Sequence, residues 1–203
     1  MKNIMQNRTI LILMIGILLL ALPLSAQLKR EGLIFSEVYL NEEEPGENWV
    51  EIYNPTLEPL ILEAFRTYNV ETINVLPEEI NNKGGLEIAP GECVIICTDR
   101  NKLKYNGTAR ILQINTMGAI GDGGFLAIRT KSMGEDGVDI FRFGDPEKTS
   151  RLKEEVGDFV VPFSTENESY SRINIGASEE LSTYGFEKTE PSPGIQTHEG
   201  GLK

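Results

Sequence analysis

The residue types that most often carry out nucleophilic chemistry are scarce in this sequence. His198 is the only histidine of the 203 residues, and it lies in a polar, glycine-rich stretch near the C-terminus. A serine or cysteine hydrolase needs a nucleophile, a base and an orienting group that converge in space. The chain contains neither a Gly-x-Ser-x-Gly nor a His-Glu-x-x-His pattern. We therefore predict no catalytic residue and no bound cofactor.

The two cysteines, Cys93 and Cys97, lie in the apolar run Glu92-Cys-Val-Ile-Ile-Cys-Thr98. Such a β-branched run is typical of a buried strand. Four residues of a strand cover about 13 Å, whereas bridged α-carbons lie within about 7 Å. One histidine cannot complete a mixed histidine and cysteine zinc site. We predict two buried thiols that are not bonded to each other.

Carboxylates are the one reactive group present in quantity, with 31 Asp and Glu residues. A glycosidase needs only two of them, about 5 to 9 Å apart, so their number does not indicate which pair would act. Acidic groups of the kind that attract calcium occur at Glu42–Glu44 and at Asp136, Asp139 and Asp145. Neither group has the ligand spacing of an EF-hand loop. We predict solvated loop charge at both places rather than a metal site.

The first 26 residues have the pattern of a signal peptide. Lys2 and Arg8 give a positively charged start, the run Ile10–Leu22 is apolar, and small residues lead to Ala26. The alternative is an uncleaved anchor, but the apolar run is shorter than the roughly 20 residues that a spanning helix needs. We predict cleavage after Ala26 and an exported product, secreted, periplasmic or at the cell surface, that begins at Gln27.

The predicted mature chain, residues 27–203, is strongly acidic. No acidic residue precedes residue 27, so losing Lys2 and Arg8 changes the net charge from −12 to −14. Such a surface repels phosphates, which disfavours nucleic acid and anionic lipid as partners. The length favours one domain, over residues 27–195. Residues 196–203 are too polar and glycine-rich to pack, and we predict a loose tail.

The elements that must position these residues read as short strands. Apolar runs rich in β-branched and aromatic residues alternate with Gly, Pro, Asn and Asp, which is typical of an all-β sandwich or barrel. The runs are Leu33–Leu40, Trp49–Tyr53, Leu60–Leu62, Phe65–Val70, Cys93–Thr98, Arg110–Ile114, Phe125–Thr130, Val138–Phe143 and Ser169–Ile175. We predict about nine strands and no crossover helices.

Several connections can be assigned from their residue types. Ala89–Glu92 places Pro and Gly where a type II turn requires them. Met133–Gly137 predicts a hairpin loop between two strands, and Glu42–Gly46 is too acidic to bury. Alternation within the Trp49–Tyr53 run places Val50 and Ile52 on the core face.

The segment Asp145–Glu166 is predicted to be an insertion that leaves the sandwich. Asp145 can cap a short helix with Pro146 in its first turn. Only Leu152 and Val156 would face inward. A segment with so few apolar residues adds little to a core.

In order along the chain, these pieces resemble a lamin tail domain of the type found in exported bacterial proteins. The resemblance rests on Ile34–Tyr39, Asn48–Thr56, Pro59–Leu62, Leu86–Ile96, Gly121–Arg129, Gly137–Gly144, Ser169–Arg172 and Pro191–Gly194. It covers Leu33 to Gly194. The segments Thr67–Gly85 and Asp145–Glu166 depart from the family pattern.

The resemblance implies an immunoglobulin-like β-sandwich and supplies no catalytic residues. Two classes of function follow. The first is an exported, non-enzymatic module that contacts a protein or glycan through loops or a strand edge. The second is a small carboxylate-based hydrolase, or a carbohydrate-recognition accessory to one, built from acids and the aromatics Trp49, Tyr53 and Tyr68. Aromatics aligned on an exposed face beside two close carboxylates would favour the second.

The signal-peptide assignment predicts the mass of the mature product. We expect protein from the native host to begin at Gln27, because the apolar run is too short to span a membrane. Intact-mass measurement tests this. A mass that includes residues 1–26 would identify the segment as a retained anchor.

Overall fold

The computed structural model describes residues 32–69, 73–75, 85–105, 107–114, 117, 123–134, 137–144, 161–172 and 185–194. These residues form two β-sheets and one 3-10 helix, η1 (Pro45–Glu47). Sheet A contains, in spatial order, β11 (Phe186–Thr189), β10 (Ser169–Arg172), β1 (Ile34–Tyr39), β2 (Trp49–Tyr53), β6 (Cys93–Cys97) and β7 (Arg110–Gln113). Sheet B contains β4 (Ile73–Val75), β3 (Leu60–Asn69), β8 (Gly123–Thr130) and β9 (Val138–Gly144), with β5 (Leu86–Ile88) also paired to β3. The all-β prediction is confirmed.

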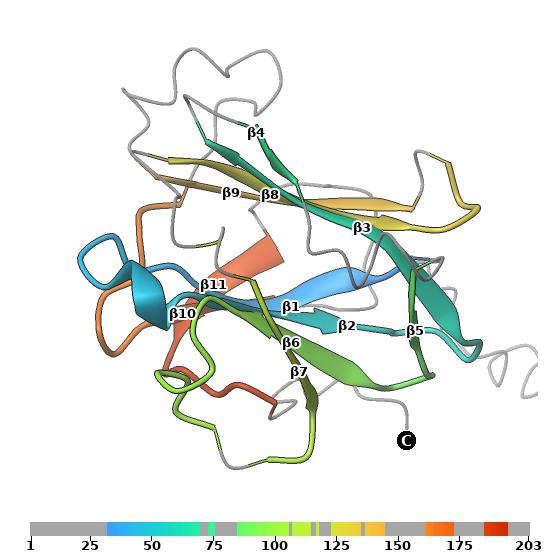
Figure 1. Cartoon of the computed structure of the whole chain (residues 1–203), viewed down its shortest axis with the longest axis horizontal. Helices are drawn as coiled ribbons and strands as arrows, with labels where there is room; N and C mark the ends of the chain where they lie inside the picture. Colours follow the sequence, from blue (N-terminus) through green and yellow to red (C-terminus); the bar gives the residue numbers. More distant parts are fainter. Residues whose placement is uncertain are drawn as a thin grey trace, which may run out of the picture.

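The two sheets lie face to face as two layers (Figure 1). One apolar cluster fills the space between them and takes side chains from both sheets. Val50 and Ile52 are fully buried in it, as their alternation predicted, and Phe65 and Phe141 face them from sheet B. Burying these side chains stabilises the fold by about 1.5 to 3 kcal/mol each relative to leaving them exposed.

The described residues contain eleven strands, where the sequence predicted about nine. The runs Leu60–Leu62 and Phe65–Val70 are one strand, β3, whose pairing with β8 shifts register between Leu62 and Ala64. A β-bulge of this kind interrupts the alternation without ending the strand. The strands β4, β5 and β11 were not predicted, because runs of three or four residues carry little periodic signal.

The predicted turns are present. Gly91 has φ +72° and the amide of Glu92 donates to the carbonyl of Ala89 at 3.0 Å, which is the type II turn. The loop after Thr130 joins β8 to β9 as an antiparallel hairpin. The acidic side chains at Glu42–Glu44 are exposed, and η1 follows them.

The described strand pairs are antiparallel except β6 and β7, which run parallel. Parallel neighbours need a connection that crosses from one end of the sheet to the other. Here the crossover connection, residues 98–109, lies against the face of sheet A that is turned away from sheet B (Figure 1). Its Leu103, Tyr105 and Ala109 pack on Trp49 and on neighbours in the sheet. Sheet A is therefore covered on both faces.

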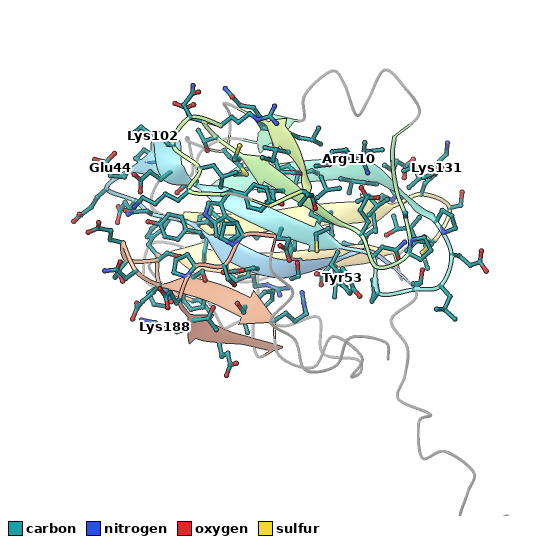
Figure 2. All side chains as sticks on the ribbon, turned by 90° about the horizontal axis from the view of Figure 1, so that it is seen from below. Glu44, Tyr53, Lys102, Arg110, Lys131 and Lys188 are labelled. Carbon is teal, nitrogen blue, oxygen red and sulfur yellow. The ribbon has the colours of Figure 1, made fainter. Side chains whose placement is uncertain are left out.

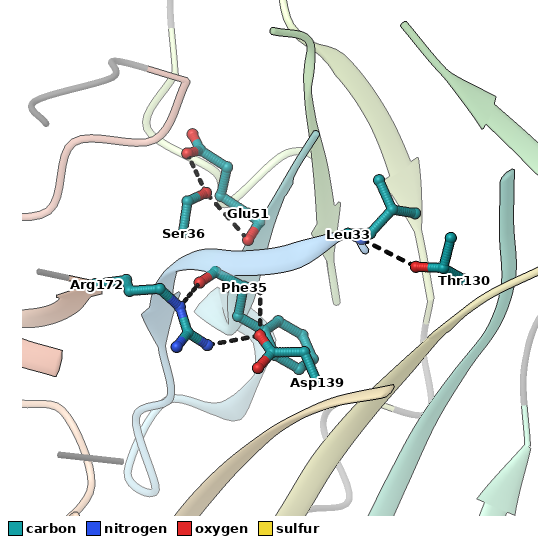
Figure 3. A network of polar contacts seen from close by, with 7 residues as sticks. All are labelled: Leu33, Phe35, Ser36, Glu51, Thr130, Asp139 and Arg172. Atoms are coloured by element: carbon teal, nitrogen blue, oxygen red, sulfur yellow. Dashed lines mark hydrogen bonds and ion pairs between the residues drawn. The ribbon is translucent and has the colours of Figure 1, made fainter. Parts of the chain in front are cut away.

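A buried ion pair joins the two sheets (Figure 3). The Arg172 guanidinium of β10 lies 2.5 Å from Asp139 Oδ2 of β9, and both side chains are almost fully buried. The backbone of Phe35 in β1 completes the network: its amide donates to Asp139 Oδ2 at 2.8 Å, and its carbonyl accepts from Arg172 Nε at 2.7 Å. The guanidinium also lies over the ring of Phe186, 4.3 Å from its centroid. These contacts fix β1 relative to both sheets.

Two predictions are corrected here. Asp139 is not a solvated loop charge, because it lies within β9 and its side chain points into the sandwich, where Arg172 compensates it. The described end of the predicted insertion, 161–166, packs on the sandwich instead of leaving it. Val161 is buried in the core, and the amide of Ser164 donates to the carbonyl of Leu40 at 2.7 Å. These residues close the end of the core beside Phe143.

The ion pair gives a stability prediction. We expect Asp139→Asn to lower the free energy of unfolding by about 3 to 5 kcal/mol, because it leaves the Arg172 charge buried without its counter-ion. Urea denaturation at pH 7 measures this.

The matched control is Glu63→Gln, which removes the half-exposed ion pair with Arg129 at 3.6 Å. A surface pair of this kind contributes less than about 1 kcal/mol. Equal losses in the two variants would contradict the role given to Asp139.

Candidate functional site

The side chains that could take part in chemistry lie on the outer face of sheet A, which other segments of the chain cover. Glu37 of β1 and Glu51 of β2 are paired residues of adjacent strands, and both are almost fully buried. Cys93 and Cys97 lie on the same face, in β6. The site is therefore a carboxylate pair beside two thiols, inside the protein.

A β-bulge places Glu37 on this face. The register between β1 and β2 shifts between Phe35 and Glu37, so Ser36 and Glu37 both face outward. Val38 then returns to the core between the sheets. Without the extra residue, strict alternation would direct Glu37 into that apolar core.

Glu37 accepts hydrogen bonds from neutral donors only, among the described residues. Its Oε1 accepts from Ser169 Oγ at 2.5 Å and from the amide of Ser192 at 2.9 Å, and its Oε2 accepts from Ser192 Oγ at 2.9 Å. Burial raises the pKa of Glu37, and the hydrogen bonds from Ser169 and Ser192 lower it only in part.

Glu51 has a similar environment (Figure 3). Its Oε1 accepts from Ser36 Oγ at 2.5 Å, and its Oε2 accepts from the amide of Gly194 at 2.7 Å. Burial raises the pKa of Glu51, the bonds from Ser36 and Gly194 oppose this, and the charge of Glu37 raises the pKa further. Like charges placed opposite each other on neighbouring strands are destabilising.

The segment 190–194, which we name the C-terminal strap, covers both carboxylates. It donates the amides of Ser192 and Gly194 to them. The strap follows β11 and runs along the outer face of sheet A (Figure 1). A Cβ atom on Gly194 would lie 2.4 Å from the ring of Tyr105, so the strap also packs tightly on the crossover connection. Substrate cannot reach the carboxylates while the strap is in place.

The cysteines behave as predicted from the strand geometry. Both are buried and neither forms a disulfide. Cys93 shares a side-chain hydrogen bond with Glu51. Burial raises the pKa of the Cys97 thiol, which disfavours the reactive thiolate.

A pocket of about 180 Å³ lies on the surface where the strap meets the end of β1 and β2. Its floor includes Tyr39 and Trp49, whose rings are stacked with centroids 6.0 Å apart. Lys102 and Glu47 stand at its rim, and Pro191 of the strap forms a wall. In the described part of the chain, this cavity brings aromatic, apolar and charged side chains together at the surface.

A second hollow lies beside η1 and is lined mainly by acidic side chains. Glu44 there pairs with Lys102 at 3.2 Å, at the end of the molecule opposite Lys131 (Figure 2). In the parts of the chain that the structure describes, no three acidic, histidine or cysteine side chains are arranged to hold a metal ion. The side chains of Glu42–Glu44 are exposed.

Two of the aromatics named for carbohydrate recognition, Trp49 and Tyr53, do not form an exposed platform. Trp49 is 4% exposed and Tyr53 is 5% exposed. The side chain of Tyr68, together with Asp136, Asp145 and His198, lies outside the described residues. Sequence reasoning missed the pairing of Glu37 with Glu51. The sequence contained a usable signal. Glu51 lies two residues from both Trp49 and Tyr53, so in a strand it shares a face with two large aromatics.

The chain matches no protein-family model and no curated protein. Among the described residues, no helix is long and apolar enough to span a membrane.

The buried carboxylates predict a dependence of stability on pH. Because the pKa values of Glu37 and Glu51 are raised in the folded state, folding favours their protonated forms. Their contribution is fully present below the normal glutamate pKa and is lost as the pH rises through the raised values. We expect Glu51→Gln to raise the free energy of unfolding at pH 7 by about 1 kcal/mol or more.

The side-chain amide of Gln at position 51 has hydrogen-bond partners. Its Nε2 can donate to Ser36 Oγ, and Ser36 Oγ can donate to the backbone carbonyl of residue 51, which lies 3.3 Å away in the wild-type chain. Denaturation at pH 4 and pH 7 measures the effect, which should shrink at pH 4. The exposed substitution Glu42→Gln is the control. A Glu51→Gln chain that is less stable than wild type at pH 7 would contradict the analysis.

Proposed function

We propose that this chain is an exported, non-enzymatic interaction module of the lamin-tail type, with an immunoglobulin-like sandwich that presents a binding surface to a protein or glycan. Three features support the proposal: the ordered series of motifs from Leu33 to Gly194, the two packed sheets, and the signal-peptide pattern of residues 1–26.

The observation that carries the proposal is the contrast between buried chemistry and exposed recognition. Glu37, Glu51 and Asp139 are at most 2% exposed, and each is engaged in holding strands or the strap. The pocket over Tyr39 and Trp49, by contrast, combines aromatic edges with charged and amide groups. A surface concavity in which a few polar groups converge over apolar side chains is the usual composition of a binding site.

Charge supports a protein or glycan partner over a polyanion. Polyanion binding gains affinity when Lys and Arg displace counterions. The chain has 19 basic residues against 31 acidic ones. Several basic groups on the described surface are already paired with acids, as Lys102 is with Glu44 and Lys188 with Glu168. On the described surface, this pairing disfavours a continuous basic face.

Two measurements on the mature chain test the class of function. We expect no turnover in a broad hydrolase panel supplied with metals, and no DNA gel shift at moderate salt. Turnover that a single Asp or Glu substitution abolishes would establish the hydrolase alternative, and salt-sensitive DNA binding in the micromolar range would overturn the proposal.

A third measurement tests the pocket. We expect binding to the isolated cell envelope to fall at least tenfold, about 1.4 kcal/mol, in Lys102→Glu. Lys131→Glu carries the same charge change at the opposite end of the molecule and should bind as wild type does (Figure 2). Equal binding by all three chains would remove the pocket from the proposal.

A further inference from the structure

The C-terminal strap is held in the manner of a bound peptide. It is not part of the ladder of either sheet, and its backbone bonds to the sheet end on side-chain carboxylates. The amide of Ser192 binds Glu37 and the amide of Gly194 binds Glu51. Two carboxyl acceptors on adjacent strands therefore bind two backbone amides that are two residues apart.

The sequence of the strap matches this arrangement at each position. Pro191 and Pro193 have no amide hydrogen, so only Ser192 and Gly194 can donate within the run. Ser192 adds its hydroxyl, which donates to Glu37 Oε2 at 2.9 Å. Gly194 has φ +75°, and a side chain there would collide with the ring of Tyr105. The two carboxylates and Tyr105 thus select Ser at the second position and Gly at the fourth position of the segment.

Holding a strap in this way is costly if its only purpose is to cover the sheet. Well-packed apolar residues cover a sheet without burying two carboxylates, and they are often more stabilising than buried charge. Paired acceptors of fixed spacing instead supply selectivity for a pattern of donors. The pocket beside Pro191 adjoins the strap and is lined by charged and amide side chains as well as by Tyr39 and Trp49, so a longer peptide has further surface to contact.

We propose that the outer face of sheet A is a recognition site for a Pro-Ser-Pro-Gly peptide segment, occupied in cis by residues 191–194 and open to the same segment from another chain. The inference rests on the proposed interaction function and names the chemistry of a partner. The strap lies after the last strand, and residues 173–184 separate it and β11 from β10, so sequence length does not prevent exchange.

The cis strap sets the outcome expected for the wild-type chain. A tethered ligand acts at an effective concentration in the millimolar range, so a free peptide competes poorly with it. Variants that expel the strap should expose the site. Gly194→Val combines a disfavoured φ with the collision against Tyr105, and Ser192→Pro removes both the amide and the hydroxyl donor.

The probe is the synthetic peptide Thr-Glu-Pro-Ser-Pro-Gly, with blocked ends, and the readouts are calorimetry and the fluorescence of Trp49, the only tryptophan. We expect both full-length variants to bind the peptide at least tenfold more tightly than wild type does. The control peptide carries Val in place of Gly and should not bind. Circular dichroism and cooperative unfolding confirm that the variants fold.

A measurement on the wild-type chain keeps the test independent of the variants. Millimolar peptide should speed hydrogen exchange at the amides of Ser192 and Gly194, and the Val control peptide should leave it unchanged. If neither strap variant binds the peptide, or if millimolar peptide leaves these two amides protected, the inference is overturned.

Two sources of the segment are distinguished by mixing. Gly194→Val has an empty site, and Glu51→Ala has a freed strap, so the two chains complement each other. A heterodimer in native mass spectrometry identifies a second copy of this chain as the source, and peptide binding without a heterodimer identifies another protein. Failure of the peptide assay with intact envelope binding overturns this inference alone. Turnover or DNA binding overturns the proposed function.

Discussion

The architecture follows from one constraint: the central strands of sheet A, β10, β1, β2 and β6, are buried on both faces. Sheet B covers the inner face, while the crossover connection and the C-terminal strap cover the outer one. The five residues of β2 are consequently all buried, and so are the five of β6. The polar residues of these strands cannot face water, because the outer face of the sheet also lies inside the protein. Each polar group on the outer face therefore needs a partner within the protein.

The protein meets that need in two different ways. Between the sheets, a full charge is balanced by an opposite charge, and the open backbone groups of Phe35 complete the network. Under the strap, the two carboxyl groups are held by hydroxyls and backbone amides, and Glu51 also by the thiol of Cys93. The first arrangement holds the two layers in register over a sequence separation of 33 residues. The second makes the position of the strap depend on the ionisation of Glu37 and Glu51, which a purely apolar cover would not do.

Periodicity and turn-forming residue types were enough to predict the fold class, the core role of Val50 and Ile52, the type II turn at Gly91 and two buried thiols that are not bonded to each other. These depend on local geometry, which a single strand or turn determines. The candidate site depends on pairing between distant segments, and periodicity carries no information about it. Nothing in Ser36–Glu37 announces the bulge that turns Glu37 outward, and nothing in Pro191–Gly194 indicates which residues it will cover. Asp139 was assigned to solvent because its counter-ion lies in a strand 33 positions further on.

The place of β1 in the middle of sheet A also bears on how the chain folds. Its neighbours are β2, the next strand along the chain, and β10. The pairing with β10 joins Glu37 to Ser171, which lies far along the sequence. During synthesis β1 emerges early, and one of its edges has no partner until almost all the chain is available. Pairing between strands so far apart in the sequence slows folding, because the entropy of closing the long intervening loop is lost before the contacts that offset this loss can form. Under the export that we propose, that delay is an advantage, because an early, stable sandwich would be harder to translocate.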